Sequence, residues 1–268
     1  MNVHDPADGP HIVTGLDLDD PARVDALLDR LDPALTRLKI GKQLFTLGGP
    51  AVVERVQRRG YEVFLDLKFH DIPNTVAGAV AAAASLGVWM VNVHASGGPR
   101  MLAAAREAID RLPAGARPHL IAVTVLTSHT REDLAATGID VSPAEQVERL
   151  VRLSVAAGMD GVVCSAEECA TLRRTVPAGF LLVTPGIRPE HSVADDQRRI
   201  LTPYDAIAAG SDQLVMSRPV IDAADPSAVL AACTAEVRRA LRDRPDTTRE
   251  QALDTTRGQA LDTTRGQA

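Results

Sequence analysis

The segment Glu62–Phe69, with the sequence EVFLDLKF, constrains the fold more than any other part of the chain. The period-two geometry of a β-strand puts Asp66 and Lys68 on one face of this segment and the intervening apolar side chains on the other. Charged side chains that point into the interior of a sheet are costly unless they are paired. The segment therefore predicts a core strand whose polar face is either a buried ion pair that only fills the interior or part of a functional site.

Seven more apolar runs have the length and composition of strands. They are His11–Leu18, Arg37–Gly41, Trp89–Ala95, His119–Thr127, Gly161–Ser165, Leu181–Ile187 and Gln213–Arg218. Helical patterns separate them: Asp20-Pro21 and Asp225-Pro226 place a cap before a proline, and Ser142–Glu145 reads as a capping box. Eight strands that alternate with eight helices predict a single (β/α)8 TIM barrel over residues 11–245. An open doubly wound sheet is the alternative, but no GxGxxG follows the first run.

The ends of the chain differ from the barrel region. Residues 1–10 form an N-terminal extension that lacks the basic and then apolar pattern of a signal peptide. Residues 246–268 repeat an octapeptide, DTTREQAL, DTTRGQAL and DTTRGQA, whose only apolar groups are Ala and Leu. Such a segment predicts a disordered tail. No stretch of about 18 apolar residues occurs, so no membrane association is expected.

Composition excludes several classes of function. The 268 residues carry 29 Lys and Arg side chains against 35 Asp and Glu, a net charge of -6, and only 3% are aromatic. This balance disfavours a nucleic-acid binder, which needs a basic face and stacking platforms. Three cysteines without a CxxC pair fit a reducing cytosol, so a cytoplasmic location is expected. The histidines show no metal-ligand spacing, and no metal site is predicted.

Further charges lie at the expected strand ends, where the active sites of TIM barrels are found. Lys39 lies on the strand next to Asp66 and Lys68, Asp71 follows just beyond them, and Asp17 ends the first strand. An alternating Lys–Asp–Lys–Asp array at a barrel mouth is more typical of prearranged electrostatics than of packing.

Two arginines follow the last two strands, in the loops that usually bind phosphate in this fold. Arg188 lies in the sequence TPGIRP and Arg218 in SRP, and both suit a phosphate dianion through forked hydrogen bonds. Between them, residues 195–199 are expected to form a lid over the ligand. The alternative is that both arginines form only a solvated rim.

The segment Phe64–Thr75, FLDLKFHDIPNT, resembles the signature of the orotidine 5'-phosphate decarboxylase family, in its bacterial branch. The resemblance continues in order from about His11 to Leu241, through RLKIGK, VNVHASGG and IAVTVLTS. It implies a carbon–carbon lyase that decarboxylates orotidine 5'-monophosphate to uridine 5'-monophosphate, the last step of pyrimidine (UMP) biosynthesis. It also implies a homodimeric barrel that needs no metal or organic cofactor.

The resemblance also implies a role for each matching residue. Lys68 donates a proton to C6, Asp66 lies beside the departing carboxylate, and Lys39 and Asp71 complete the array. The substrate-binding set is Asp17 and Lys39 on the ribose, Asp66, Thr127 on the pyrimidine, Gln197, Arg188 and Arg218 on the phosphate, and Ile72, Thr75 and Ser217. Asp71 and Thr75 are implied to reach into the partner subunit's site.

One position departs from the family pattern, which usually has glycine before the last arginine. This chain has Ser217 there. Its backbone N–H can still meet phosphate, but its Cβ restricts close approach, so a weaker grip on the phosphate is expected.

Three rival functions stay open. A metal-dependent sugar-phosphate synthase of the same superfamily shares the Asp-x-Lys-x-x-Asp strand and uses Mg²⁺, whereas Thr127 and the segment 70–75 favour the decarboxylase. A Schiff-base aldolase needs a free amine, and Lys68 between acids is expected to stay protonated. A nucleotide-binding protein without catalysis is suggested only by Ser217.

Overall fold

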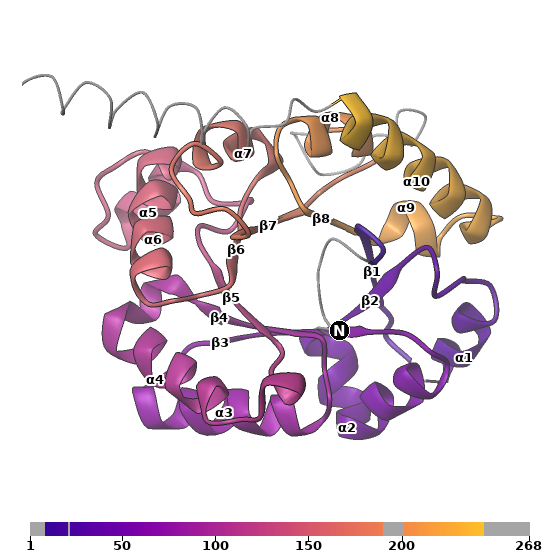
Figure 1. Ribbon diagram of the computed structural model, residues 1–268, viewed down its shortest axis with the longest axis horizontal. Coiled ribbons are helices and arrows are strands. Elements are labelled where there is room, and N and C mark those ends of the chain that lie inside the picture. The colour runs from indigo at the N-terminus through magenta and orange to yellow at the C-terminus, as the bar shows by residue number, and fades with distance from the viewer. Residues whose placement is uncertain (1–8, 21, 190–200, 244–268) are drawn as a thin grey trace, which may run out of the picture.

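The computed structural model describes residues 9–20, 22–189 and 201–243 and has eight parallel strands in a closed barrel, surrounded by helices (Figure 1). The strands are β1 (Ile12–Gly15), β2 (Arg37–Gly41), β3 (Val63–Phe69), β4 (Met90–His94), β5 (His119–Val123), β6 (Gly161–Val163), β7 (Leu181–Pro185) and β8 (Gln213–Met216). This confirms the predicted (β/α)8 TIM barrel. The lid segment around Gln197 and the repeat tail lie outside the described residues.

Helices follow the strands around the outside of the barrel (Figure 1). They are α1 (Arg23–Leu28), α2 (Lys42–Arg58), α3 (Pro73–Ser85), α4 (Gly98–Asp110), α5 (Arg131–Ala136), α6 (Pro143–Ala156), α7 (Ala166–Leu172), α8 (Pro203–Ala208), α9 (Arg218–Ile221) and α10 (Pro226–Asp243). Within the described ranges, no helix combines the length and the apolar character needed to cross a lipid bilayer.

The predicted helix starts are confirmed in part. Asp225 caps α10 through a hydrogen bond from the Ala228 N–H. Ser142 caps α6, but the Glu145 carboxylate bonds Arg149 instead of completing the capping box. The helix α1 begins at Arg23, and the Asp20 carboxylate accepts the Ala22 N–H, while Pro21, the predicted first helical residue, lies outside the described residues.

The core has two layers, as expected for strands that are covered on both faces. Inside the barrel lie Val13, Phe64, Trp89, Met90, Ile121, Leu181, Val183 and Val215. The larger layer lies between the strands and the helices. At the amino-terminal end, the Arg37 guanidinium stacks 4.1 Å from the centre of the Trp89 ring and pairs with Glu62 at 2.7 Å. The interior is therefore filled at this end.

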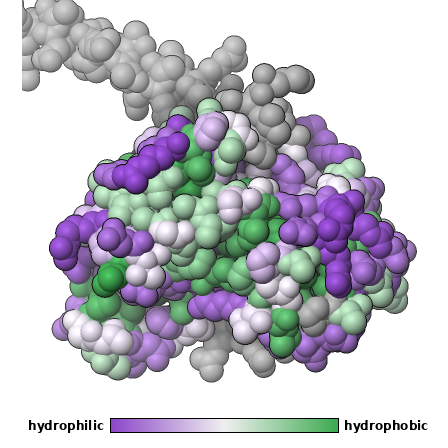
Figure 2. Space-filling model, turned by 90° about the horizontal axis from the view of Figure 1, so that it is seen from below, coloured by the Kyte–Doolittle hydropathy of each residue, from purple (hydrophilic) through white to green (hydrophobic). Residues whose placement is uncertain are grey.

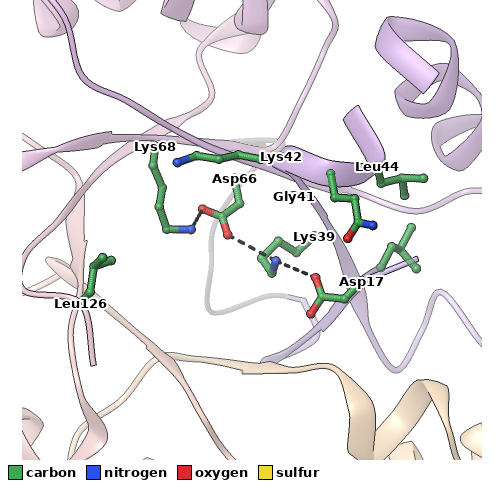
Figure 3. Close-up of a pocket in the computed structure, with 10 residues that line it drawn as sticks. Asp17, Lys39, Gly41, Lys42, Leu44, Asp66, Lys68 and Leu126 are labelled. Carbon is green, nitrogen blue, oxygen red and sulfur yellow. Dashed lines mark hydrogen bonds and ion pairs between the residues drawn. The ribbon is translucent and has the colours of Figure 1, made fainter. Parts of the chain in front are cut away.

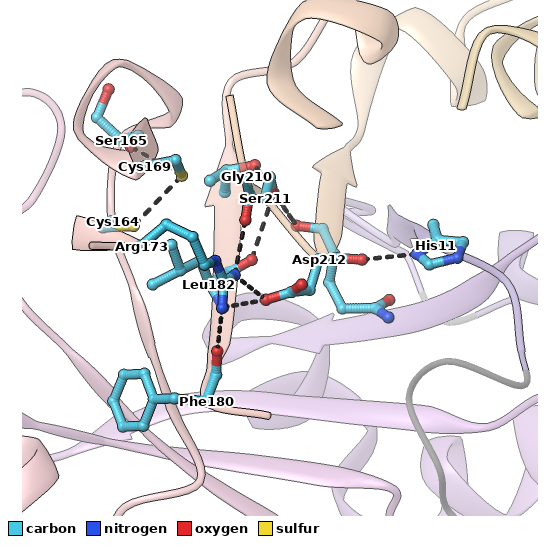
Figure 4. Close-up of polar contacts among 12 residues, drawn as sticks. His11, Cys164, Ser165, Cys169, Arg173, Phe180, Leu182, Gly210, Ser211 and Asp212 are labelled. Atoms are coloured by element: carbon cyan, nitrogen blue, oxygen red, sulfur yellow. Dashed lines mark hydrogen bonds and ion pairs between the residues drawn. The ribbon is translucent and has the colours of Figure 1, made fainter. Parts of the chain in front are cut away.

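Polar contacts also tie the last strands together at the amino-terminal end (Figure 4). The Asp212 carboxylate pairs with Arg173 and accepts the Leu182 N–H at 2.8 Å. The carbonyl of Asp212 bonds the His11 ring, and Arg173 also donates to the Phe180 carbonyl. These bonds join the starts of β7, β8 and β1, so they serve closure of the barrel rather than chemistry.

Candidate active site

Four charged side chains of alternating sign form a row at the carboxyl ends of β1, β2 and β3 (Figure 3). Lys68 Nζ lies 2.5 Å from Asp66 Oδ1, and Asp66 Oδ2 lies 3.3 Å from Lys39 Nζ. Lys39 Nζ in turn lies 3.5 Å from Asp17 Oδ1. We call Asp17, Lys39, Asp66 and Lys68 the charge array. Its connectivity rules out the alternative of one isolated ion pair.

Strand register explains how Lys39 reaches the centre of the array. Gly15 on β1 is the neighbour of Lys39, and Gly41 on β2 is the neighbour of Asp66. A Cβ atom added at Gly15 would lie 3.2 Å from the Lys39 side chain, and one at Gly41 would lie 3.4 Å from its Nζ. The two glycines therefore provide the space in which Lys39 lies between two carboxylates.

A bulge in β3 brings Lys68 to Asp66. The register steps from Leu65 to Phe69 on β3 while β4 advances only from Val91 to Val93. Within this bulge Lys68 has a φ of 53°, and among the described residues it is the one non-glycine with positive φ. Such a conformation costs about 1–3 kcal/mol and persists only where neighbouring contacts impose it.

Asn92 on β4 is a residue of the site that the sequence reasoning missed. It is fully buried, and its Nδ2 donates to Asp66 Oδ1 at 2.7 Å. Its Oδ1 accepts the backbone N–H of Lys68 at 2.8 Å. A buried amide in the middle of an apolar strand, VNVH, is the signal that could have revealed it.

The array keeps Asp66 ionised. Burial acts to raise the pKa of the Asp66 carboxyl, but the charges of Lys39 and Lys68 and the hydrogen bonds from Lys68 and Asn92 together hold it below its usual value. His94, at the end of β4, has its pKa lowered to about 4 by burial and by electrostatic interactions with His70, Lys42 and Lys68. At neutral pH the His94 ring is therefore uncharged.

The array borders two adjoining cavities at the carboxyl end of the barrel. One, of about 300 Å³, is lined by Leu16, Asp17, Lys39, Gly41, Lys42, Gln43, Leu44, Asp66, Lys68 and Leu126. The other, of about 290 Å³, is lined by Lys39, Phe64, Asp66, Lys68, Val123, Val125, Leu126, Thr127, Ser128, Val163, Pro185 and Val215. Thr127 and Lys68 thus line the same cavity.

Lys42, the first residue of α2, is a second cavity residue that the sequence reasoning did not single out. Composition contains a signal for it. The chain has 29 Lys and Arg side chains, but only Lys39, Lys42 and Lys68 are lysines. All three line the same cavity, while the cations elsewhere are arginines.

The residues after β3 lie apart from the array of their own chain. Among the described residues, the Asp71 carboxylate bonds the Ile72 N–H at 2.6 Å rather than a lysine of the array. The resemblance implies that Asp71 completes the array and reaches into the partner subunit's site, and this stays a prediction. Ile72 is 66% exposed, and Thr75 is exposed in the first turn of α3.

The predicted phosphate residues lie on the loops after β7 and β8. Arg188 is buried with 5% exposure, which excludes a merely solvated rim for this side chain, and Arg218 is exposed at the start of α9. Gln197 lies outside the described residues. Ser217 precedes α9, and its hydroxyl donates to the Gly15 carbonyl at 2.9 Å.

Comparisons with known proteins identify the family of the chain. Residues 10–233 match the "Orotidine 5'-phosphate decarboxylase / HUMPS family". The chain is 56% identical over 240 residues to an orotidine 5'-phosphate decarboxylase of Saccharophagus degradans, covering 90% of this chain and 98% of that one. It is 61% identical over 212 residues to one of Chromohalobacter salexigens, covering 79% and 89%.

A solved structure supports the same assignment. The crystal structure of orotidine 5'-phosphate decarboxylase from Lactobacillus acidophilus superposes with a TM-score of 0.76 at 38% identity, covering 86% of this chain and 99% of that one. The range that matches the family model, residues 10–233, spans all eight strands and the positions of the charge array. The chain belongs to the orotidine 5'-phosphate decarboxylase / HUMPS family.

Proposed function

We propose that the charge array performs the decarboxylation of orotidine 5'-phosphate to uridine 5'-phosphate, with Lys68 as the proton donor to C6. The chain is an orotidine 5'-phosphate decarboxylase, a carboxy-lyase, by its family and by relatives at 56–61% identity. The observation that supports the residue roles is the 2.5 Å contact between Lys68 and Asp66 beside a cavity. The same relatives disfavour the sugar-phosphate synthase, which belongs to the same superfamily.

The chemical step breaks the bond between C6 and the carboxylate carbon. Carbon dioxide leaves, the bonding electron pair stays on C6, and the Lys68 ammonium supplies the proton that replaces the carboxylate. The neutral amine of Lys68 then regains a proton from solvent. Because Asp66 holds the ammonium in place before the reaction, the positive charge needs no reorganisation as the negative charge develops on C6.

Asp66 contributes in a second way. Its carboxylate stays ionised, so the carboxylate of a bound substrate meets a like charge that disappears with carbon dioxide. Two unit charges about 4 Å apart interact by about 4 kcal/mol at an effective dielectric of about 20. Lys39 offsets part of this repulsion and also faces Asp17, which suits a ribose hydroxyl between them.

Phosphate binding supplies the energy that holds the ring against the array. Arg188 and Arg218 belong to the loops that follow β7 and β8, and we assign them to the phosphate together with Gln197. Ser217 contributes its backbone N–H, and Thr127 contacts the pyrimidine. Binding energy from a group remote from C6 raises the rate when it is used for orientation.

The protein acts as a homodimer in this proposal. Ile72 is 66% exposed, and Asp71 and Thr75 lie beside it at the start of α3, away from their own array. Figure 2, the view from below Figure 1, shows apolar residues gathered on the side where α2, α3 and α4 lie. A second copy on this side would receive Asp71 and Thr75 in its own site. The proposal places the dimer in the cytoplasm.

Replacement of Lys68 tests this proposal. Lys68→Ala removes the proton donor and Lys68→Arg keeps the charge but not an acid of suitable pKa, so both variants are expected to lose turnover. The assay is the loss of orotidine 5'-phosphate absorbance, and uridine 5'-phosphate affinity checks that the site still forms. Arg149→Ala, which breaks an exposed ion pair on α6, is the control that keeps full activity.

Two results would contradict the assignment. Near-normal turnover by Lys68→Ala would exclude Lys68 as the proton donor. Loss of activity on treatment with EDTA would favour the Mg²⁺-dependent synthase, because the proposed chemistry uses only side chains of the protein.

A further inference from the structure

Asn92 connects Asp66 and Lys68, two neighbouring members of the charge array, through one amide. The side chain lies in the middle of β4, fully buried. Its Nδ2 donates to Asp66 Oδ1 at 2.7 Å, the same oxygen that receives the Lys68 ammonium at 2.5 Å. Its Oδ1 accepts the backbone N–H of Lys68 at 2.8 Å. Both ends of the amide are therefore engaged by the array.

The second of these bonds occurs where the β3–β4 ladder is interrupted. The register pairs Leu65 with Val91 and Phe69 with Val93, so Asn92 is the β4 residue that faces the bulge. The side-chain oxygen of Asn92 receives a backbone N–H that the bulge has displaced from regular pairing. Lys68 has positive φ at this point, and the bond stabilises that conformation.

We propose that Asn92 is a positioning residue for the decarboxylation, which holds the Lys68 backbone in its left-handed conformation and orients the Asp66 carboxylate at the same time. The inference rests on the roles proposed above for Lys68 and Asp66. Asn92 lies beneath these two residues and acts through them; it does not itself contact the substrate.

The polarity of the two partners explains why asparagine suits this position. The Lys68 N–H can only donate, and the ionised Asp66 carboxylate can only accept, so the residue between them must offer one acceptor and one donor. Leucine has the same size but offers neither group. Aspartate keeps the acceptor but replaces the donor with a second negative charge next to Asp66.

Asn92→Leu removes both bonds at nearly constant volume. We expect kcat to fall by about 100-fold, the typical effect of a misplacement of about 1 Å at a reacting centre. The Kd of uridine 5'-phosphate is expected to stay within about threefold, since phosphate and ribose contacts lie elsewhere. Thr14→Val is the matched control: Thr14 is also a fully buried strand residue, and its hydroxyl bonds Thr36 outside the site.

Asn92→Asp gives a readout that a merely structural role would not change. The new carboxyl faces Asp66 and Lys68 on β3. The other titratable groups nearby are Lys39 on β2, which pairs with the same Asp66 carboxylate, and His94, two residues further along β4. Repulsion between two adjacent carboxylates raises the pKa of one of them, so the pair takes up a proton as the pH falls. The protonated carboxyl at position 92 can then donate a hydrogen bond to Asp66, as the asparagine does. The ratio of variant kcat to parent kcat is therefore expected to rise by at least tenfold from pH 8 to pH 5.5.

The outcomes separate this inference from the proposed function. A kcat of Asn92→Leu within twofold of the parent, or a pH profile of Asn92→Asp parallel to that of the parent, would overturn the positioning role. If Asn92→Leu does not fold by circular dichroism, the pH profile of Asn92→Asp decides. If Lys68→Ala is active, the proposed function fails first; if Lys68→Ala is inactive and both Asn92 variants behave like the parent, only this inference fails.

Discussion

The Asp66 charge can be removed in a variant that does not catalyse the reaction. The change in substrate affinity then measures how strongly the Asp66 carboxylate opposes substrate binding. Lys68→Ala is the background, because without the proton donor the substrate stays intact during a binding measurement. Asp66→Asn then removes one negative charge at almost constant volume. The quantity of interest is the affinity for orotidine 5'-phosphate relative to uridine 5'-phosphate, which lacks only the reacting carboxylate.

The size of the effect follows from the distances in the array. Asp66 Oδ2 lies 3.3 Å from Lys39 Nζ, an attraction of about 5 kcal/mol at an effective dielectric of about 20. This attraction keeps Asp66 ionised and in place while the substrate carboxylate binds next to it. At a separation of about 4 Å the two carboxylates repel by about 4 kcal/mol. Since about 1.4 kcal/mol is a factor of ten, relief of most of this repulsion corresponds to about 100- to 1,000-fold in Kd.

Isothermal titration of both nucleotides into the single and double variants provides the measurement. We expect Asp66→Asn to lower the Kd of orotidine 5'-phosphate by about 100- to 1,000-fold and that of uridine 5'-phosphate by less than about threefold. Asp17→Asn in the same background is the control, because Asp17 also faces Lys39, at 3.5 Å. It is expected to change both affinities alike. An unchanged ratio of the two affinities after Asp66→Asn would refute repulsion as a contribution to catalysis.

Three further outcomes concern stability and the phosphate site. The folded-state pKa of His94 is about 4 and its ordinary value is 6.5, so the unfolded chain binds more protons between these values and stability falls as the pH drops from 6.5 to 4. In His94→Asn this loss in the free energy of unfolding should be smaller by about 1–2 kcal/mol, a modest value because the ring is only half buried, as measured by urea unfolding at pH 6.5 and pH 4. An equal loss in the variant and the parent would contradict the lowered pKa of His94. Asp212→Ala leaves Arg173 without its carboxylate and should cost about 2–3 kcal/mol, seen as a Tm lower by about 5–10 °C with kcat unchanged; a lower kcat would mean that the amino-terminal end matters for the chemistry. Ser217→Gly removes the hydrogen bond to Gly15 and the Cβ, so the free energy of unfolding should fall by about 1 kcal/mol while KM decreases; an unchanged KM would show that Ser217 does not weaken the grip on the phosphate.

The positions where strands begin could be predicted closely from the sequence. β5 begins at His119 and β7 at Leu181, as the apolar runs predict. Their ends could not be predicted in the same way: β5 ends at Val123 and β7 at Pro185, before the expected Thr127 and Ile187. The residues that follow β5 are also apolar, because Val125 and Leu126 line the cavity. Composition therefore could not separate the strand from the loop that follows it.

The charge array could be predicted in part. Alternation along one strand placed Asp66 and Lys68 on the same face, and the adjacent strand supplied Lys39. Asp17 joins the array because strand register brings β1 next to β2, so that its carboxylate meets Lys39. The alternation of residues along one strand predicts which face a side chain is on. It does not predict which side chain of the neighbouring strand it will contact, because that depends on the register between the strands.

By itself, the sequence determined the barrel, the family and three charges at its mouth, Lys39, Asp66 and Lys68, because each follows from local periodicity or from a motif that is contiguous along the chain. Only the tertiary structure decided that Lys68 lies in a bulge with positive φ and that Asn92, 24 residues later, supports it. The physical reason is that a bulge depends on the register between two strands, and the hydrogen bond that stabilises it comes from the neighbouring strand. Neither property is present in the segment EVFLDLKF until β4 lies beside it.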